Sequence, residues 1–159
     1  MTALALVLFL DLDGVLNSEA YWARRKGHGV TLVSSRGQMI DPQAVTHLNR
    51  IVETTGCLVV LSSSWRLQRG ALLDVGDWLR QAGFVGALYD LTPRTPDTRG
   101  GQIAAWLAQH PEVARYAILD DEPDFDTHQD RWVVTSYATG LTEREADQAI
   151  ALLTAGRGA

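Results

Sequence analysis

Two pairs of aspartates in this chain each come directly after a short apolar run. Asp11 and Asp13 follow the first run, and Asp120 and Asp121 follow a much later one. Ionised carboxylates avoid apolar surroundings unless they are paired or bind a cation. If the two runs are neighbouring strands, the four carboxylates converge and repel one another without a cation. Because oxygen ligands with no nearby His or Cys suit Mg²⁺ better than Zn²⁺, the pattern predicts a magnesium site.

A cluster of hydroxyl groups follows another apolar run, between the two acidic pairs, at Ser62, Ser63 and Ser64. The alternative interpretation is that the aspartates are turn residues, because Asp13 is followed by Gly14 and Asp-Gly is a common turn sequence. Two acidic pairs together with a hydroxyl cluster favour a functional site over two unrelated turns.

The apolar patterning predicts the elements that must position these residues. It predicts strands at residues 3–10, 57–61, 85–88, 116–119 and 132–135. It predicts helices at residues 41–54, 72–81, 101–109 and 142–153. Strands that alternate with helices indicate an α/β, Rossmann-like open parallel sheet of five strands with helices on both faces. Ligands of such sheets bind beyond the carboxyl ends of the strands, where the aspartates and serines lie.

The composition suits one globular domain spanning residues 1–159, with 46% hydrophobic residues and a net charge of −5. An acidic chain is a poor candidate for tight, nonspecific binding to nucleic acid, which relies on many contacts from Lys and Arg to phosphates. The apolar start has no basic residues before it and is too short to span a membrane. Cys57 has no partner for an internal disulfide, so we expect a cytoplasmic protein.

Several segments resemble the motifs of the haloacid dehalogenase (HAD) superfamily. Residues 8–16, LFLDLDGVL, are similar to its first motif, a hydrophobic strand followed by DxDG. Residues 59–62 resemble the second motif, a strand ending in Ser or Thr, and residues 117–121 the fourth, a strand ending in paired acids. The third-motif cation must be Arg, since Lys26 is the one lysine of the chain; Arg99 is the best match, and Arg94 competes with it.

A narrower resemblance is to HAD domains associated with RNA-repair proteins. It rests on residues 61–66, LSSSWR, on Thr92-Pro93, on Arg99-Gly100 and on Gly140-Leu141-Thr142. The gaps between the motifs leave room for a short flap, roughly residues 17–40, and for no large cap. Capless members of the superfamily tend to act on large substrates, because nothing closes over the site.

The resemblance implies a role for each motif residue. Asp11 would be the nucleophile that becomes an aspartyl phosphate, and Asp13 the general acid and base. Ser62 would hydrogen-bond the phosphoryl oxygens, and Arg99 would screen the charge between Asp11 and the phosphate. Mg²⁺ would be held by Asp11, by the backbone carbonyl of Asp13 and by a fourth-motif aspartate. We favour Asp121 as that direct ligand and Asp120 as its support, and the reverse assignment stays open.

Together these features predict a Mg²⁺-dependent phosphatase that hydrolyses phosphomonoesters at nucleic-acid or nucleotide ends. Ser63, Trp65 and Arg66 are the expected substrate-binding residues, since Trp stacks on bases and Arg binds phosphates. Packing of Trp65 and an ion pair of Arg66 are the structural alternatives. Two other functions stay open: a small-molecule phosphatase such as a nucleotidase, and a HAD-like binding module without catalysis. The sequence does not indicate an oligomeric state.

Overall fold

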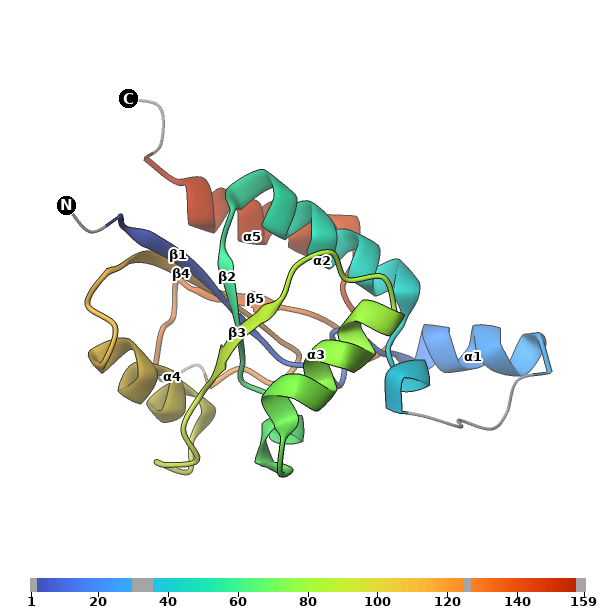
Figure 1. The fold of residues 1–159 in the computed structure, drawn as a ribbon. Coiled ribbons are helices and arrows are strands. Elements are labelled where there is room, and N and C mark those ends of the chain that lie inside the picture. The colour runs from blue at the N-terminus through green and yellow to red at the C-terminus, as the bar shows by residue number, and fades with distance from the viewer. Residues whose placement is uncertain (1–2, 30–35, 125–126, 157–159) are drawn as a thin grey trace.

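The fold is built on one five-stranded parallel sheet in the part of the chain that the structure describes (Figure 1). The structure is a computed structural model, and it describes residues 3–29, 36–124 and 127–156. In chain order the strands are β1 (Ala5–Leu10), β2 (Leu58–Leu61), β3 (Leu88–Leu91), β4 (Val113–Asp120) and β5 (Trp132–Val134). Their order across the sheet is β3-β2-β1-β4-β5, and every pairing is parallel. This architecture confirms the α/β, Rossmann-like fold that the sequence predicts.

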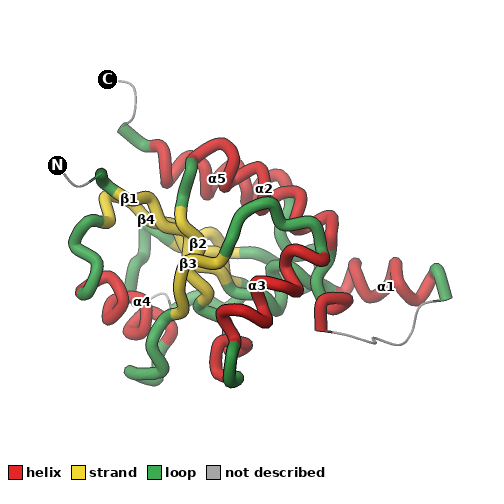
Figure 2. Tube along the Cα trace, viewed as in Figure 1, coloured by secondary structure: helices red, strands yellow, loops and turns green. Residues whose placement is uncertain are grey.

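Helices cover both faces of the sheet, which is the central yellow layer in Figure 2. One face packs on α2 (Pro42–Thr55), α3 (Ala71–Gln81) and α5 (Glu143–Thr154), and the other packs on α4 (Arg99–Ala108). The side chains of β1 divide between the two cores. Leu8 belongs to the first core, whereas Phe9 belongs to the second and meets the ring of Trp106 edge-on, 5.4 Å between centroids. Burial on both faces explains why β1 is apolar throughout.

Local sequence signals account for the ends of α2 and α5. The side chain of Asp41 accepts a hydrogen bond from Gln43 N, and α2 is capped at its C-terminus by Gly56, whose φ of 69° is left-handed. Thr142 and Glu145 form a capping box at the start of α5. The sequence predicts both helices within two residues of their observed ends.

The third strand differs from its prediction. The sequence predicts a strand at residues 85–88, but β3 lies at Leu88–Leu91, and the side chain of Val85 is 63% exposed. The observed strand contains Asp90, a residue type that strands disfavour. Its carboxylate accepts a hydrogen bond from Trp106 Nε1 at 2.8 Å, a partner from α4 that offsets this local preference.

The expected flap between β1 and α2 contains the helix α1 (Glu19–Gly27), which the sequence analysis does not predict, and a short 3-10 turn, η1 (Arg36–Met39). Figure 1 shows α1 projecting away from the sheet and its covering helices. Tyr21 is its one buried residue, and the Tyr21 hydroxyl donates a hydrogen bond to Gln38 O at 2.6 Å. The described residues hold no large cap. Among the described residues, no helix has the length and hydropathy of a membrane-spanning segment.

Candidate active site

The carboxyl ends of β1 and β4 bring three aspartates together. The two strands are neighbours, with Leu10 opposite Leu119, and Asp11 N donates to Leu119 O at 3.0 Å. One carboxylate oxygen from each of Asp11, Asp120 and Asp121 lies within 4.8 Å of the others. Residues far apart in the sequence therefore meet at the edge of the sheet where the sequence analysis expects a ligand.

The electrostatics of this cluster favour a bound cation. Arg99 Nη1 lies 2.9 Å from Asp120 Oδ2 and 3.4 Å from Asp11 Oδ1. One guanidinium does not neutralise three carboxylates. Burial, followed by the charge of Asp11, raises the pKa of Asp120 to about 7 and that of Asp121 to about 6. An all-oxygen donor set that is short of positive charge fits Mg²⁺.

The two fourth-motif aspartates have different surroundings. Asp120 is 1% exposed, binds Arg99, and accepts a hydrogen bond from Glu122 N at 2.9 Å. Asp121 is less buried and lines an open cleft of about 500 Å³. We call it the catalytic cleft, for the role that we propose for it, and its other lining residues are Asp11, Asp13, Ser64, Arg99, Glu122 and Tyr137. The Asp121 carboxylate is thus the one of the pair that faces the cleft.

Gly14 allows Asp121 to approach the loop after β1. Its φ of 76° is left-handed, and a Cβ at this position would lie 2.2 Å from Asp121 Oδ2. The Gly14 carbonyl accepts a hydrogen bond from Thr135 Oγ1 at 2.7 Å, from the residue after β5. The DxDG glycine is therefore needed for a close approach as well as for its turn.

Asp13 lies at the cleft with both of its carboxylate oxygens hydrogen-bonded. Asn17 Nδ2 donates to Oδ1 at 2.9 Å, and Trp65 Nε1 donates to Oδ2 at 3.0 Å. Asn17 Oδ1 also accepts a hydrogen bond from Gly14 N at 3.0 Å, so the Asn17 side chain is itself held by the loop after β1. Asn17 and Thr135 are site residues that the sequence analysis misses. Asn17 had one available signal, its position four residues after Asp13.

The three serines after β2 occupy different positions. Ser62 is fully buried, and its Oγ has no hydrogen-bond partner among the described residues. Ser63 is also buried, and its Oγ accepts from Trp65 N at 3.3 Å at the start of the 3-10 turn η2 (Ser64–Leu67). Ser64 is exposed and lines the catalytic cleft. A buried hydroxyl without a partner is uncommon in folded proteins, so Ser62 is a candidate for binding a ligand oxygen.

Arg66 is buried beneath the loops that follow β2 and β3. Its Nε and Nη atoms donate to Gln102 Oε1 at 2.6 Å and to four backbone carbonyls, those of Ser62, Ser63, Thr92 and Pro93. These contacts use all five N–H groups of the guanidinium, so none is left for a substrate in this structure. Arg66 supports the loops, a role that differs both from the predicted phosphate contact and from the ion-pair alternative.

Trp65 is 7% exposed and packs edge-on against Trp78, with 5.9 Å between ring centroids. The guanidinium carbon of Arg36 lies 5.6 Å from the centre of the Trp65 ring. A ring enclosed in this way has no free face on which a base could stack. The polar contribution of Trp65 to the site is the hydrogen bond from its indole N–H to Asp13.

The two candidate third-motif arginines lie in different places. Arg99 begins α4 and contacts the acidic cluster, as described above. Arg94 is exposed and donates to Leu67 O at 2.7 Å, outside the catalytic cleft. The position next to Asp11 belongs to Arg99.

His128 ties the loop after β4 to the start of α4, and the sequence analysis assigns it no specific role. Its Nε2 lies 2.8 Å from Gly100 O, and its Nδ1 lies 2.7 Å from the Tyr116 hydroxyl. Its φ of 54° is the one left-handed value of a non-glycine residue among the described residues. Because Gly100 directly follows Arg99, this contact supports the residue that holds the acidic cluster.

Comparison with known proteins agrees with this geometry. A family model for the HAD domain in Swiss Army Knife RNA repair proteins matches residues 7–146, a range from β1 into α5 that includes the acidic cluster, Arg99 and the serines after β2. No curated protein and no solved structure matches the chain. The family match covers most of the sequence, and the chain belongs to the family of HAD domains found in Swiss Army Knife RNA repair proteins.

Proposed function

We propose that this protein is a Mg²⁺-dependent phosphatase that hydrolyses phosphomonoesters through an aspartyl phosphate on Asp11, with nucleic-acid or nucleotide ends as substrates. The observation that carries the proposal is the convergence of Asp11, Asp13, Asp121 and Arg99 on one open cleft at the carboxyl edge of the sheet. Such a cleft combines a nucleophile, a proton donor and positive charge, which are the components that phosphoryl transfer requires.

In the first step Asp11 attacks the phosphorus atom of the substrate. A bond forms between an Asp11 carboxylate oxygen and phosphorus, and the bond from phosphorus to the leaving oxygen breaks. Asp13 gives its proton to that leaving oxygen, so that an alcohol departs. The hydrogen bonds from Asn17 and Trp65 support this role, since they orient the Asp13 carboxyl at the cleft.

In the second step water releases the phosphate. Asp13, now a carboxylate, takes a proton from the water, whose oxygen attacks phosphorus. The bond from phosphorus to Asp11 breaks, inorganic phosphate leaves, and the Asp11 carboxylate is restored. The Arg99 guanidinium, 3.4 Å from Asp11, screens the repulsion between this carboxylate and the anionic substrate.

The proposed magnesium ligands are the Asp11 carboxylate, the Asp13 backbone carbonyl and the Asp121 carboxylate. Asp120, which is buried and hydrogen-bonded to Arg99, would support the site without binding the ion directly. When bound, Mg²⁺ would neutralise charge on the phosphoryl oxygens beside Asp11. A phosphoryl oxygen that reached the Ser62 hydroxyl would satisfy this buried group, which has no partner among the described residues.

The openness of the cleft supports a large substrate. No described residue of the flap lines this cleft, so the part of the flap that the structure describes leaves it open. A phosphate at the end of a nucleic-acid strand could therefore enter. We further propose a cytoplasmic location, supported by the buried, unpaired thiol of Cys57.

Hydrolysis of an aryl phosphate, with and without Mg²⁺, tests the reaction. We expect turnover that needs the metal and is lost in Asp11→Asn, because the amide is not a nucleophile. The matched control is Asp77→Asn, which changes an exposed carboxylate on α3 outside the cleft. Thermal unfolding of both variants establishes that they fold. Activity in folded Asp11→Asn equal to that of the parent protein would refute the assignment.

A further inference from the structure

A second cleft lies at the carboxyl edge of the sheet, beside the catalytic one. It has a volume of about 420 Å³ and is lined by Arg66 and by residues 68–73 and 91–94. We call it the Arg69–Arg94 groove, after the two exposed arginines that line it. Its volume lies within the range of small-ligand sites, roughly 300–1,000 Å³.

The Arg69–Arg94 groove carries positive charge that no described carboxylate pairs with directly. Three arginines line it, and none of the lining residues is Asp or Glu. Arg69 and Arg94 make no ion pair with any residue that the structure describes. The chain as a whole has a net charge of −5, so this local positive charge is opposite in sign to that of the protein.

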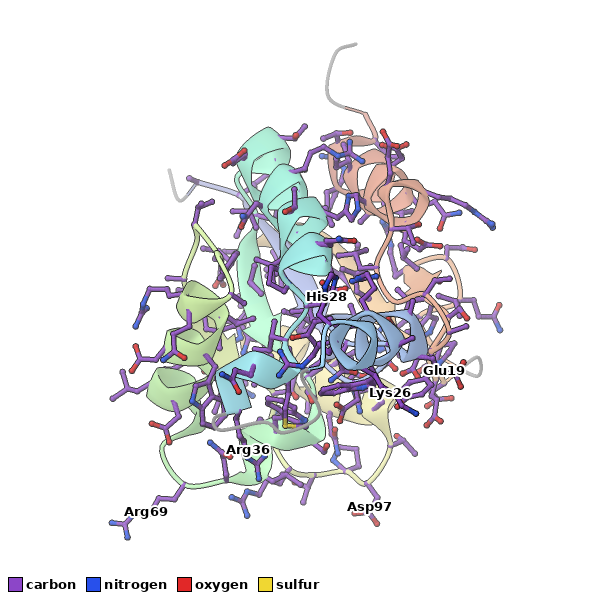
Figure 3. The ribbon with its side chains drawn as sticks, turned by 90° about the vertical axis from the view of Figure 1, so that its right-hand side faces the viewer. Glu19, Lys26, His28, Arg36, Arg69 and Asp97 are labelled. Atoms are coloured by element: carbon purple, nitrogen blue, oxygen red, sulfur yellow. The ribbon has the colours of Figure 1, made fainter. Side chains whose placement is uncertain are left out.

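Arg69 is free to meet a ligand. Figure 3 shows its side chain extending outward from the loop before α3, with Asp97 on the opposite side of the view. Asp97 belongs to the loop after β3 but does not line the groove. An anion that approaches Arg69 and Arg94 would therefore meet two guanidinium groups and no lining carboxylate.

The groove and the catalytic cleft share one short element. Ser64, the first residue of η2, lines the catalytic cleft, and Leu67, its last, accepts the hydrogen bond of Arg94 at 2.7 Å. A 3-10 turn rises about 2 Å per residue, so the two ends of η2 lie about 6 Å apart. Arg66 lies between them, and burial, followed by the charges of Arg99 and Arg94, lowers the pKa of its guanidinium.

We propose that the Arg69–Arg94 groove binds a second phosphate group of the substrate, an internal phosphodiester of the strand whose terminal phosphate lies at Asp11. The inference rests on the proposed phosphatase function and deepens it. It predicts the direction of the strand, from the catalytic cleft across η2 toward the ends of β2 and β3. A contact of this kind to a phosphate favours longer strands, which carry more phosphates, and does not distinguish base sequences.

Kinetics on substrates of different length test the groove. We compare kcat/KM for a mononucleotide, a nucleoside bisphosphate and a trinucleotide that carry the same terminal phosphate. The trinucleotide should be preferred over the mononucleotide, and the combined change of Arg69→Ala and Arg94→Gln should lower that preference about tenfold. Gln retains an N–H for Leu67 O. The matched control, Arg80→Ala, removes an exposed arginine at the far end of α3 and should leave the preference unchanged.

The bisphosphate distinguishes two sources of the second phosphate. Its second phosphate stands where the first internal phosphodiester of a strand would stand, so equal preferences agree with the proposal. A bisphosphate clearly preferred over the trinucleotide would assign the groove to small bisphosphates and would overturn the proposed strand. Ionic strength gives an independent readout, since the slope of log KM against log salt should fall by about 0.7 for each lost phosphate contact on a single strand. If the double variant kept the same preference for the trinucleotide over the mononucleotide, the proposed phosphate site in the groove would be wrong.

Binding separates failure of the groove from failure of the phosphatase function. Fluorescence anisotropy of a labelled, phosphorylated trinucleotide on Asp11→Asn protein needs no turnover. Weaker binding when Arg69→Ala and Arg94→Gln are added to the Asp11→Asn protein would support the phosphate site in the groove, even if the parent protein releases no phosphate. Equal binding with and without the two arginine changes, together with hydrolysis by the parent protein, would support the phosphatase function and reject the phosphate site in the groove.

Discussion

The carboxylate of Asp13 is oriented by donors from two different parts of the chain. Asn17 belongs to the same loop, whereas Trp65 comes from the turn after β2. A general acid depends on its position as much as on its proton, since proton transfer requires hydrogen-bond distance to the leaving oxygen. At the scale of single residues, we therefore expect Trp65 to act through Asp13 and not through contact with a base.

Trp65→Phe should separate these two roles. Phe retains the aromatic packing on Trp78 but removes the hydrogen bond to Asp13 Oδ2. The loss of one such bond is worth about 1 kcal/mol, so kcat should fall about fivefold with little change in KM. The measurement is steady-state hydrolysis of an aryl phosphate. Trp78→Phe is the matched control, and a loss of kcat of the same size there would point to packing alone.

At the scale of elements, the start of α4 is held against the loop that follows β4. His128 contacts Gly100 O, and a Cβ on Gly100 would lie 1.8 Å from Thr127 Oγ1. Trp132 of β5 donates its indole N–H to Thr127 O at 2.5 Å. These contacts join α4, which carries Arg99, to the segment that follows Asp120 and Asp121.

His128→Ala should loosen this connection. Removing a partly buried hydrogen-bonded ring should cost about 1–2 kcal/mol and lower Tm by roughly 2–8 °C. It should also raise KM for the phosphate ester, because Arg99 loses the support of its neighbour Gly100. Tyr116→Phe is the control, since it removes one partner of His128 and leaves the contact with Gly100. An unchanged KM in His128→Ala would limit this residue to a stabilising role.

At the scale of the whole molecule, the acidic cluster links stability to pH and to metal. Asp120 and Asp121 have folded-state pKa values of about 7 and about 6, above the ordinary value near 3.9. The folded protein therefore binds more protons than the unfolded chain between about pH 4 and 7. The free energy of unfolding of the metal-free protein should fall as pH rises through that window.

Mg²⁺ should restore the stability that these carboxylates lose. The ion binds the deprotonated groups, so its stabilising effect should be larger at pH 8 than at pH 5. The measurement is Tm at both pH values, in EDTA and in excess Mg²⁺. In Asp121→Asn, which removes one like charge and one proposed ligand, the metal-free protein should lose less stability with rising pH and gain less from Mg²⁺. An equal gain from Mg²⁺ at the two pH values would contradict this coupling.

The amino-acid sequence alone determined the features that depend on neighbouring residues. The apolar run before Asp11, the cap at Asp41 and the capping box of Thr142 and Glu145 predict elements that the structure contains. The parallel α/β topology followed from the alternation of strands and helices. With β1 and β4 adjacent, their two acidic ends had to meet, because parallel strands end at the same edge of a sheet.

Tertiary structure alone decided the roles that depend on distant partners. The sequence could not choose between Arg94 and Arg99, because their different surroundings arise from the loop after β2 and from β4. Burial of Trp65 and Arg66 likewise arises from packing between elements far apart in the chain. Side-chain type sets what a residue is able to bind, but its neighbours in the folded molecule determine which of its donors and faces stay free.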